Sequence, residues 1–328
     1  MTRLALIARA DNGGLGNQTW EMANHLKPEK VLVVHSRHIT RGHADVSRYV
    51  DSEAEVRITP RGPTDAEARW LCYGIDKILT AETFYGTAIP TAARRRGVLT
   101  INHCNPEMFR ATDTADVNLA PTDWRMDRLP KGTRVVPMPV VMASDEGWDG
   151  HRTICHVHSD AMWDRNGTGD LLDALQYLHE STLVTILGGK AGYEEIGKAT
   201  VIWLGPIQDS YKIAWKQMRG IFVLPRRFGG LCLPIQEAAA RSRPIITTNV
   251  GPQNKWQGAA LVPASVRSIE TMPGGRFEVY QCSPRGLAHE IERVLTIHGP
   301  LLAKRASEWA SERSWEALGP LWTSICRD

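Results

Sequence analysis

The sequence predicts an α/β protein made of two Rossmann-like, doubly wound domains that face a cleft. Its 328 residues are too many for one ordinary core and suffice for two domains. Short, continuously apolar segments alternate with helical patterns along both halves, as in parallel sheets covered by helices on both faces. A stretch rich in Pro, Gly and acidic residues, Pro137–Arg152, separates the halves. We therefore expect an N-terminal domain over residues 1–139 and a C-terminal domain over residues 140–328, which closes with a helical tail.

In the first half of the chain, short apolar runs predict strands. They are Leu4–Ala8, Lys30–Val34, Lys77–Thr80, Val98–Ile101, Val117–Leu119 and Arg134–Pro137. Helices are expected between these strands, notably over Asn17–Leu26 and Thr87–Arg96. This repeated order of strand and helix favours a parallel sheet.

The second half shows the same alternation more clearly. The expected strands are Thr153–His158, Leu183–Leu187, Val201–Leu204, Ile221–Leu224, Pro244–Thr248 and Ala259–Val262. The expected helices are Thr168–Glu180, Tyr193–Lys198, Ser210–Met218 and Pro234–Arg241. The tail Pro284–Cys326 is expected to be helical and to pack back on the body through Trp309, Trp315 and Trp322, because large aromatic side chains bury much area.

The composition is that of a soluble globular protein, since 42% apolar and 23% charged residues are close to the usual values. A formal net charge of +3 gives no strong basic field and so does not favour nucleic-acid binding. Six scattered cysteines without a C-x-x-C pair predict buried thiols in a reducing compartment. The apolar N-terminal run is too short for a signal peptide and no run is long enough for a membrane helix, so we expect a cytoplasmic protein without a membrane span.

The most informative segment is Arg227–Glu237, where a glycine pair and a Leu-Pro lead into an Ala-rich helix. Glycine lets a ligand approach the backbone without a Cβ in the way. The first turn of a helix presents N–H groups and a partial positive charge, which suit a diphosphate, and a carboxylate one turn deeper accepts hydrogen bonds from sugar hydroxyls. The segment therefore predicts a site for a phosphorylated sugar. Its candidate donor-binding residues are Gly229, Gly230, Leu231, Cys232, Leu233 and Glu237.

Two further turns carry candidate phosphate ligands. Arg165 precedes a turn at Asn166–Gly167 and suits bidentate pairing with a diphosphate, and Thr168 is the expected N-cap of the following helix. Lys190 follows two glycines at the expected end of the next strand. The alternatives are a capping loop with a solvated arginine and an exposed lysine without a role.

The turn after the first strand contains Gly13, Gly14 and Gly16. Gly14 and Gly16 are candidates for close approach to a phosphate or a sugar, and the alternative is an ordinary flexible turn. The spacing does not fit the dinucleotide-binding pattern, and no acidic residue ends the second strand. A nicotinamide cofactor is therefore not expected.

A polar segment at the end of a strand in the first domain carries the candidate catalytic residues His103, Asn105 and Glu107. We expect them to line the opposite wall of the cleft, where His103 would donate to a substrate hydroxyl or transfer a proton. The alternative is a structural histidine, and His156 and His158, on an apolar strand, are expected in or beside the core. No D-x-D motif ends a strand with apolar flanks, so no catalytic metal is expected.

Together these segments resemble the GT-B nucleotide-sugar glycosyltransferases, specifically their large retaining group. The pattern Glu-Gly-Phe-Gly-Leu-Pro-x-x-Glu-Ala of that group overlays Gly229–Ala238 without a gap. The matching positions are Gly230, Leu233, Pro234, Glu237 and Ala238. The chain departs from the group at Gly229, which replaces the first glutamate, and at Asn166, which replaces the lysine of a Lys-Gly pair.

The resemblance implies transfer of a sugar from a nucleotide diphosphate sugar, the donor substrate, to a hydroxyl acceptor. The transfer would be metal-independent and retaining, and no cofactor would be needed. The N-terminal domain would be the acceptor domain and the C-terminal domain the donor domain. Glu237 would hold the ribose, and the Gly230–Leu233 backbone with Arg165 and Lys190 would stabilise the departing diphosphate. Gly14 and Gly16 would approach the donor from across the cleft. The missing carboxylate at position 229 leaves the sugar and the anomeric outcome open. It also makes a non-catalytic nucleotide- or sugar-binding protein an alternative. A sugar-nucleotide epimerase on the same two-domain architecture is a further alternative.

The motifs do not specify the acceptor. Its expected site lies in loops within residues 36–75, with His38, Arg41, His43 and Arg48. A glycan, a protein, a small molecule and a modified DNA base are all open. The arginines and histidines of this segment make hydroxymethylated DNA a minority hypothesis.

Overall fold

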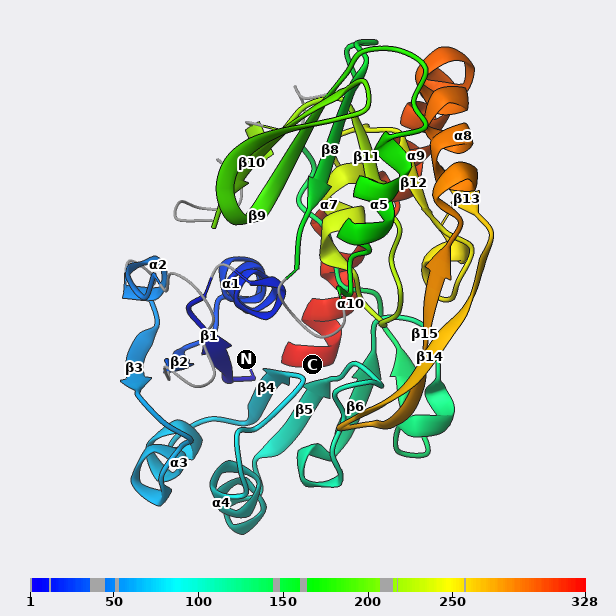
Figure 1. The fold of residues 1–328 in the computed structure, drawn as a ribbon. Coiled ribbons are helices and arrows are strands. Elements are labelled where there is room, and N and C mark those ends of the chain that lie inside the picture. The colour runs from blue at the N-terminus through cyan, green and yellow to red at the C-terminus, as the bar shows by residue number, and fades with distance from the viewer. Residues whose placement is uncertain are drawn as a thin grey trace. The chain divides into compact units, whose positions relative to one another are not determined.

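The computed structural model describes residues 2–11, 13–35, 45–50, 53–143, 148–159, 164–206, 215, 216, 218–256 and 258–328. These residues form two compact units (Figure 1). Unit 1 comprises Met1–Pro139, Met272–Gly275 and Trp315–Asp328, and unit 2 comprises Val140–Thr271 and Arg276–Ser314. The last helix, which the sequence analysis placed in the second domain, therefore belongs to unit 1.

Unit 1 is built on a parallel sheet, whose described strands number seven and follow the order β3-β2-β1-β4-β5-β6-β7. The strands are β1 (Leu4–Arg9), β2 (Lys30–Val34), β3 (Glu55–Thr59), β4 (Lys77–Ala81), β5 (Leu99–His103), β6 (Val117–Ala120) and β7 (Arg134–Val135). The chain order reverses between β1 and β4, where β1 continues to β2 on one side and β4 to β5 on the other. In such open sheets this switch point is where ligands bind.

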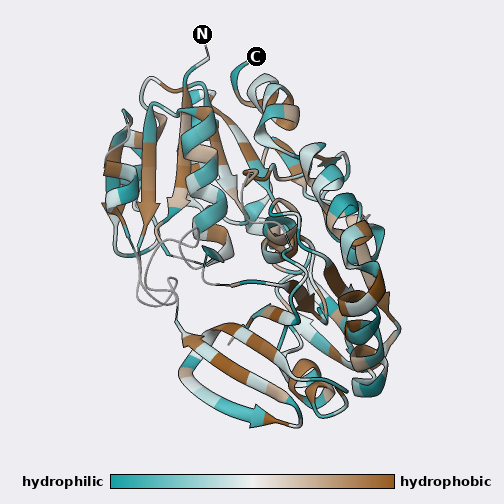
Figure 2. Cartoon of the chain, turned by 90° about the horizontal axis from the view of Figure 1, so that it is seen from above, coloured by the Kyte–Doolittle hydropathy of each residue, from teal (hydrophilic) through white to brown (hydrophobic). Residues whose placement is uncertain are grey.

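The helices of unit 1 connect these strands. They are α1 (Gly14–Leu26), α2 (Ser47–Val50), α3 (Asp65–Cys72) and α4 (Ala88–Arg96), with the short turns η1 (Ala111–Asp113) and η2 (Met126–Arg128). A core of fully buried side chains such as Ile7, Leu32 and Ile78 joins the strands to α3 and α4. Hydrophobic residues are concentrated in the strands, whereas the helices carry both hydrophobic and hydrophilic residues (Figure 2).

The last helix, α10 (Trp315–Arg327), completes unit 1. The Trp322 indole is fully buried and donates a hydrogen bond of 3.0 Å to the carbonyl oxygen of Pro137. Trp315 stacks on His25 of α1 with ring centroids 4.2 Å apart. The expected role of the tail tryptophans in packing is confirmed at these two positions.

Unit 2 contains a second parallel sheet, in which the six described strands follow the order β10-β9-β8-β11-β12-β13. They are β8 (Thr153–Val157), β9 (Thr182–Ile196), β10 (Ala199–Gly205), β11 (Ile221–Leu224), β12 (Ile245–Thr248) and β13 (Ala259–Val262). The helices are α5 (Thr168–Leu175), α7 (Leu233–Ala239), α8 (Pro284–Arg293) and α9 (Gly299–Ser311), with the turns η3 (Gln253–Lys255) and η4 (Val294–His298). Here the switch point lies between β8 and β11. The predicted α/β class with Rossmann-like parallel sheets is confirmed.

Three features of unit 2 differ from the expectations. The helix predicted over Tyr193–Lys198 is wrong, because β9 continues to Ile196 and turns at Gly197 (φ 58°) into β10, so that Thr200 pairs with Glu195 and Ile202 with Tyr193. The strands β14 (Ala264–Met272) and β15 (Gly275–Cys282) form a two-stranded sheet that the sequence analysis did not predict. Most of the helix predicted over Ser210–Met218 lies outside the described residues.

None of the helices in the described segments is long and apolar enough to cross a membrane.

Candidate functional site

The loops that follow β8 and β11 meet at the switch point of unit 2. The backbone N–H of Arg227 donates to the carbonyl oxygen of Arg165 at 3.0 Å, which joins the two loops. Gly167 has a φ of 71°, and a Cβ on it would lie 2.2 Å from the carbonyl oxygen of Pro225. Glycine is therefore required at position 167 for both its conformation and this close approach.

Arg165 lies over the glycine turn that the sequence singled out. Its guanidinium is 5.0 Å from the centre of the Phe228 ring. A Cβ on Gly229 would lie 2.1 Å from an Nη of Arg165 and 2.8 Å from an Nη of Arg226. The structure thus brings together two predicted site residues, Arg165 and Gly229, and adds Arg226.

Arg226 and Arg227 were missed by the sequence analysis. Arg226 donates a hydrogen bond of 2.6 Å to Oδ1 of Asn166. Arg227 forms ion pairs with Asp170 at 2.7 Å and Asp164 at 3.3 Å. Burial raises the pKa of the Asp170 carboxyl group, and the Arg227 charge opposes that shift. The sequence signal that could have identified them is a pair of adjacent arginines that follows a buried apolar strand and one proline.

The start of α5 differs from the prediction that Thr168 is its N-cap. The carboxylate of Asp164 accepts the N–H groups of Thr168 and Gly169, each at 2.8 Å. The Thr168 hydroxyl instead contacts Nε2 of His156 at 2.8 Å and Nδ1 of His158 at 2.9 Å. His156 is fully buried, and burial lowers its pKa to about 4, so its expected place in the core is confirmed.

The turn into α7 positions Glu237. Cys232 adopts a φ of 32°, and the helix begins at Leu233 with Pro234 in its first turn. Glu237 is partly exposed, and its Oε2 accepts a hydrogen bond of 2.8 Å from the indole nitrogen of Trp215. The carbonyl oxygen of Leu231 accepts the side-chain amide of Gln236 at 2.8 Å. The turn is thereby held by its own side chains.

Two guanidiniums and a carboxylate lie near Cys232. Burial raises the pKa of the Cys232 thiol, the charges of Arg226 and Arg165 oppose that shift, and the Glu237 charge adds to it. Both guanidiniums and the carboxylate therefore lie within electrostatic reach of the same turn. Gly230 and Leu233 of this turn are also buried.

Lys190 does not stand at a strand end. It is exposed and lies within β9, which runs on to Ile196. The two glycines before it approach the end of β8, since a Cβ on Gly188 would lie 3.2 Å from the carbonyl oxygen of His158. The reason for selecting Lys190, its expected place at the end of a strand, was wrong.

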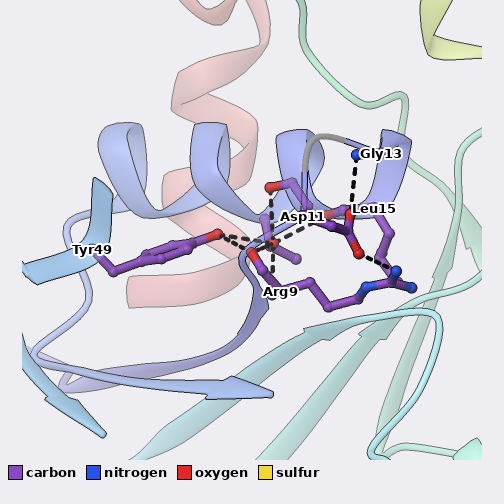
Figure 3. Close-up of polar contacts among 7 residues, drawn as sticks. Arg9, Asp11, Gly13, Leu15 and Tyr49 are labelled. Atoms are coloured by element: carbon purple, nitrogen blue, oxygen red, sulfur yellow. Dashed lines mark hydrogen bonds and ion pairs between the residues drawn. The ribbon is translucent and has the colours of Figure 1, made fainter. Parts of the chain in front are cut away.

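The switch point of unit 1 holds a buried ion pair. Asp11 is 1% exposed; it pairs with the Arg9 guanidinium, and its Oδ1 accepts the N–H of Gly13 at 3.1 Å (Figure 3). Burial lowers the pKa of Arg9, but the Asp11 carboxylate, which also accepts a hydrogen bond from Arg9, and the neighbouring Glu82 and Tyr85 outweigh it, so the net pKa is raised. These groups at the ends of β1 and β4 thus lie close together.

The two glycines proposed to approach the donor have different surroundings. Gly14 is exposed and begins α1. Gly16 is buried, and a Cβ on it would lie 1.9 Å from the carbonyl oxygen of Asp11. The absence of a side chain at Gly16 is thus explained by the close contact of α1 with the end of β1.

His103 is buried at the end of β5 with both ring nitrogens in hydrogen bonds. Nδ1 contacts Nε2 of Gln18 at 2.8 Å, and Nε2 contacts the carbonyl oxygen of Val136 at 2.9 Å. Burial lowers its pKa to about 4. These contacts assign His103 a packing role and leave no ring nitrogen for the proton transfer expected from the sequence.

The other two candidate catalytic residues are also buried. Asn105 is 6% exposed and donates a hydrogen bond of 2.6 Å to Oε1 of Glu82. Glu107 is 1% exposed, and its carbonyl oxygen accepts the N–H of Gly274. Across the residues with described positions, no group of three or more His, Cys, Asp or Glu side chains is arranged to hold a metal ion.

Residues 152–272 match the family model described as Glycosyl transferases group 1. No curated protein sequence matches the chain significantly.

Solved structures similar to the chain cover both units. They include the Anabaena protein HepE in complex with UDP and glucose (11% identity, TM-score 0.71, 99% of each chain). They also include sucrose-phosphate synthase from Thermosynechococcus elongatus (14% identity, TM-score 0.69, 99% of each chain). A third is the lipopolysaccharide outer core galactosyltransferase WaaB (14% identity, TM-score 0.64, 98% of each chain). Residues 152–272 thus form a group 1 glycosyltransferase domain, and the chain is a glycosyltransferase with the GT-B fold.

Proposed function

We propose that the chain transfers a sugar from a nucleotide diphosphate sugar to a hydroxyl acceptor, independently of a metal ion and with retention of the anomeric configuration. The observation that carries this proposal is the Arg165 guanidinium against the Gly229 backbone at the switch point of unit 2. A guanidinium beside a glycine backbone is suited to bidentate binding of phosphate oxygens. Glu237 in the same site would accept hydrogen bonds from the ribose hydroxyls.

The transfer exchanges one bond at the anomeric carbon of the sugar. The bond from this carbon to the β-phosphate oxygen breaks, the acceptor oxygen forms the new bond, and the acceptor proton passes to the departing diphosphate. The nucleoside diphosphate leaves with increased negative charge. Arg165 and the backbone of Gly230–Leu233 would stabilise that charge in the transition state, which is the role a metal ion has in other transferases.

A uridine diphosphate sugar is the donor we propose first. Structures similar to this chain contain UDP, UDP with glucose, and UDP-glucose. We retain Asn105 and Glu107 as candidates for contacting the acceptor hydroxyl, and no cofactor is proposed. The protein is proposed to act in the cytoplasm, because its six cysteines, all at described positions, are free and buried.

The acceptor is proposed only as a hydroxyl compound. Of the residues named for its site, Arg48 lies 5.0 Å from the ring of Trp20, which anchors it within unit 1. His38, Arg41 and His43 lie outside the described residues. A glycan, a protein and a small molecule are therefore tested alongside hydroxymethylated DNA.

A thermal-shift and turnover screen tests the proposal. UDP and UDP-glucose are expected to raise the melting temperature by mass action, and slow hydrolysis of the matching donor should release UDP. Arg165→Met and Glu237→Ala should each weaken the binding of UDP. Unchanged affinity in both variants would overturn the site. Formation of an epimeric nucleotide sugar without acceptor would indicate an epimerase, and binding without turnover on any acceptor would indicate a binding protein.

A further inference from the structure

Arg226 is held in one orientation by Asn166. Arg226 is 5% exposed, and its guanidinium donates to Oδ1 of Asn166 at 2.6 Å, while Nδ2 of Asn166 donates to the carbonyl oxygen of Val157 at 2.7 Å. The two hydrogen bonds define which end of the amide faces the arginine. The end of β8 thus positions a cation that comes from the end of β11.

Gly229 lets this cation and Arg165 converge. The two Nη atoms lie 2.8 Å or less from the point where a Cβ of residue 229 would stand, and the φ of Gly229 is 114°. Two cations so close repel each other by several kcal/mol at an effective dielectric constant of about 20. A diphosphate between them would offer oxygens to both guanidiniums, so the arrangement suits a ligand with more than one negative charge.

The neighbouring arginine has a different role. Arg227 lies in ion pairs with Asp170 and Asp164, and its side chain is 3% exposed. Its charge is thereby compensated within the fold, and it links α5 to the loop after β11. The adjacent Arg226 contacts the neutral amide of Asn166 and approaches Gly229.

We propose that Arg226 is a second diphosphate-binding residue, that Asn166 is its positioning residue, and that the pair Arg165–Arg226 selects nucleoside diphosphates over monophosphates. This inference rests on the proposed function, because it takes the nucleotide diphosphate as the ligand. A diphosphate offers oxygens to both guanidiniums at once, whereas a monophosphate has too few oxygens to pair fully with both.

The experiment measures Kd for UDP and for UMP by calorimetry on the full chain. Arg226→Gln is expected to weaken the binding of UDP by about tenfold or more and the binding of UMP by much less, so the preference for UDP falls. Arg226→Lys keeps the charge without the planar guanidinium, so its loss of UDP affinity should be smaller than that of Arg226→Gln. Arg305→Gln removes the same charge from an exposed position on α9 and should leave both affinities unchanged.

Asn166→Asp tests the positioning role with a side chain of the same shape. The new carboxylate would pair with Arg226 and compete with the ligand, so UDP affinity should fall. The melting temperature should also fall somewhat, because the hydrogen bond from Nδ2 to the Val157 carbonyl oxygen is lost. In the background of Arg226→Gln the same change should have little further effect, since the two residues act together.

The outcomes separate this inference from the proposed function. If the wild type binds no nucleoside diphosphate, the proposed function fails. If Arg165→Met weakens UDP but folded Arg226→Gln and Asn166→Asp keep the wild-type ratio of UDP to UMP affinity, only the assignment of Arg226 and Asn166 is overturned.

Discussion

The indole nitrogen of Trp215 donates a hydrogen bond of 2.8 Å to the Glu237 carboxylate. Trp215 is 1% exposed, packs on Phe222 of β11 and has the Arg241 guanidinium 5.0 Å from its ring. One carboxylate oxygen is therefore oriented by a fixed aromatic ring. The partly exposed Glu237 is thus positioned before a ligand arrives, which lowers the entropy cost of binding.

We predict that Glu237→Ala weakens UDP binding by about tenfold to a hundredfold, because hydrogen bonds to a charged group contribute about 1.5–3 kcal/mol. Glu237→Gln keeps an oxygen that can accept the hydrogen bond from Trp215, so it should lose less UDP affinity than Glu237→Ala. Calorimetric titration with UDP measures both. Glu308→Ala, at an exposed position on α9, is the control and should bind like the wild type. Wild-type affinity in Glu237→Ala would remove this residue from the site.

Gly229→Ala is expected to impair the diphosphate site. The added Cβ would meet the guanidiniums of Arg165 and Arg226, and the φ of 114° is unfavourable for any residue with a side chain. UDP affinity should fall by about tenfold or more, since both cations must move. Gly192→Ala is the matched control, because a Cβ there meets no atom within 4 Å. Equal affinities in the two variants would contradict the crowding inferred at Gly229.

Two helical glycines should respond in opposite ways to the same substitution. Gly16→Ala forces a Cβ against the carbonyl oxygen of Asp11 and should lower the free energy of unfolding by about 1–3 kcal/mol. Gly319→Ala in α10 meets no atom within 4 Å and should raise it by up to about 1 kcal/mol, because alanine favours the helix. Urea unfolding measures both changes. A stable Gly16→Ala variant would show that α1 does not pack as closely on β1 as the structure describes.

Stability should fall as the pH is lowered from about 6.5 to about 4. Burial lowers the pKa of His103 and His156 from 6.5 to about 4, so in this interval the unfolded chain takes up protons that the folded chain does not. Below about pH 4 both states bind these protons, and the two histidines cause no further loss.

A histidine variant isolates this contribution. His156→Gln should reduce the slope of unfolding free energy against pH by about one proton, whatever its effect on absolute stability. His151→Gln, at an exposed position, is the control. Urea unfolding at several pH values measures the slopes. An unchanged slope in His156→Gln would show that this histidine titrates alike in the folded and unfolded states.

The central strands could be predicted because burial on both faces leaves a continuous apolar run. The predicted bounds of β2 and β11 agree with the structure. The edge strand β3 (Glu55–Thr59) was not predicted, since its residues other than Thr59 are exposed or half-buried and carry no such run. The helix after it has a local signal, the capping box of Thr64 and Glu67 at the start of α3, which the sequence analysis did not use.

The sequence alone determined the fold class and the central part of the proposed donor site, because Gly229, Leu233 and Glu237 stand at fixed spacings within one turn and helix. Only the tertiary structure decided which cations converge on that turn. Asn166 and Arg226 are 60 positions apart and meet because β8 and β11 are adjacent strands. In the same way, burial at the end of β5 gives His103 two hydrogen-bond partners and a low pKa. Local spacing encodes a turn, whereas partners, burial and charge depend on contacts between segments far apart in the chain.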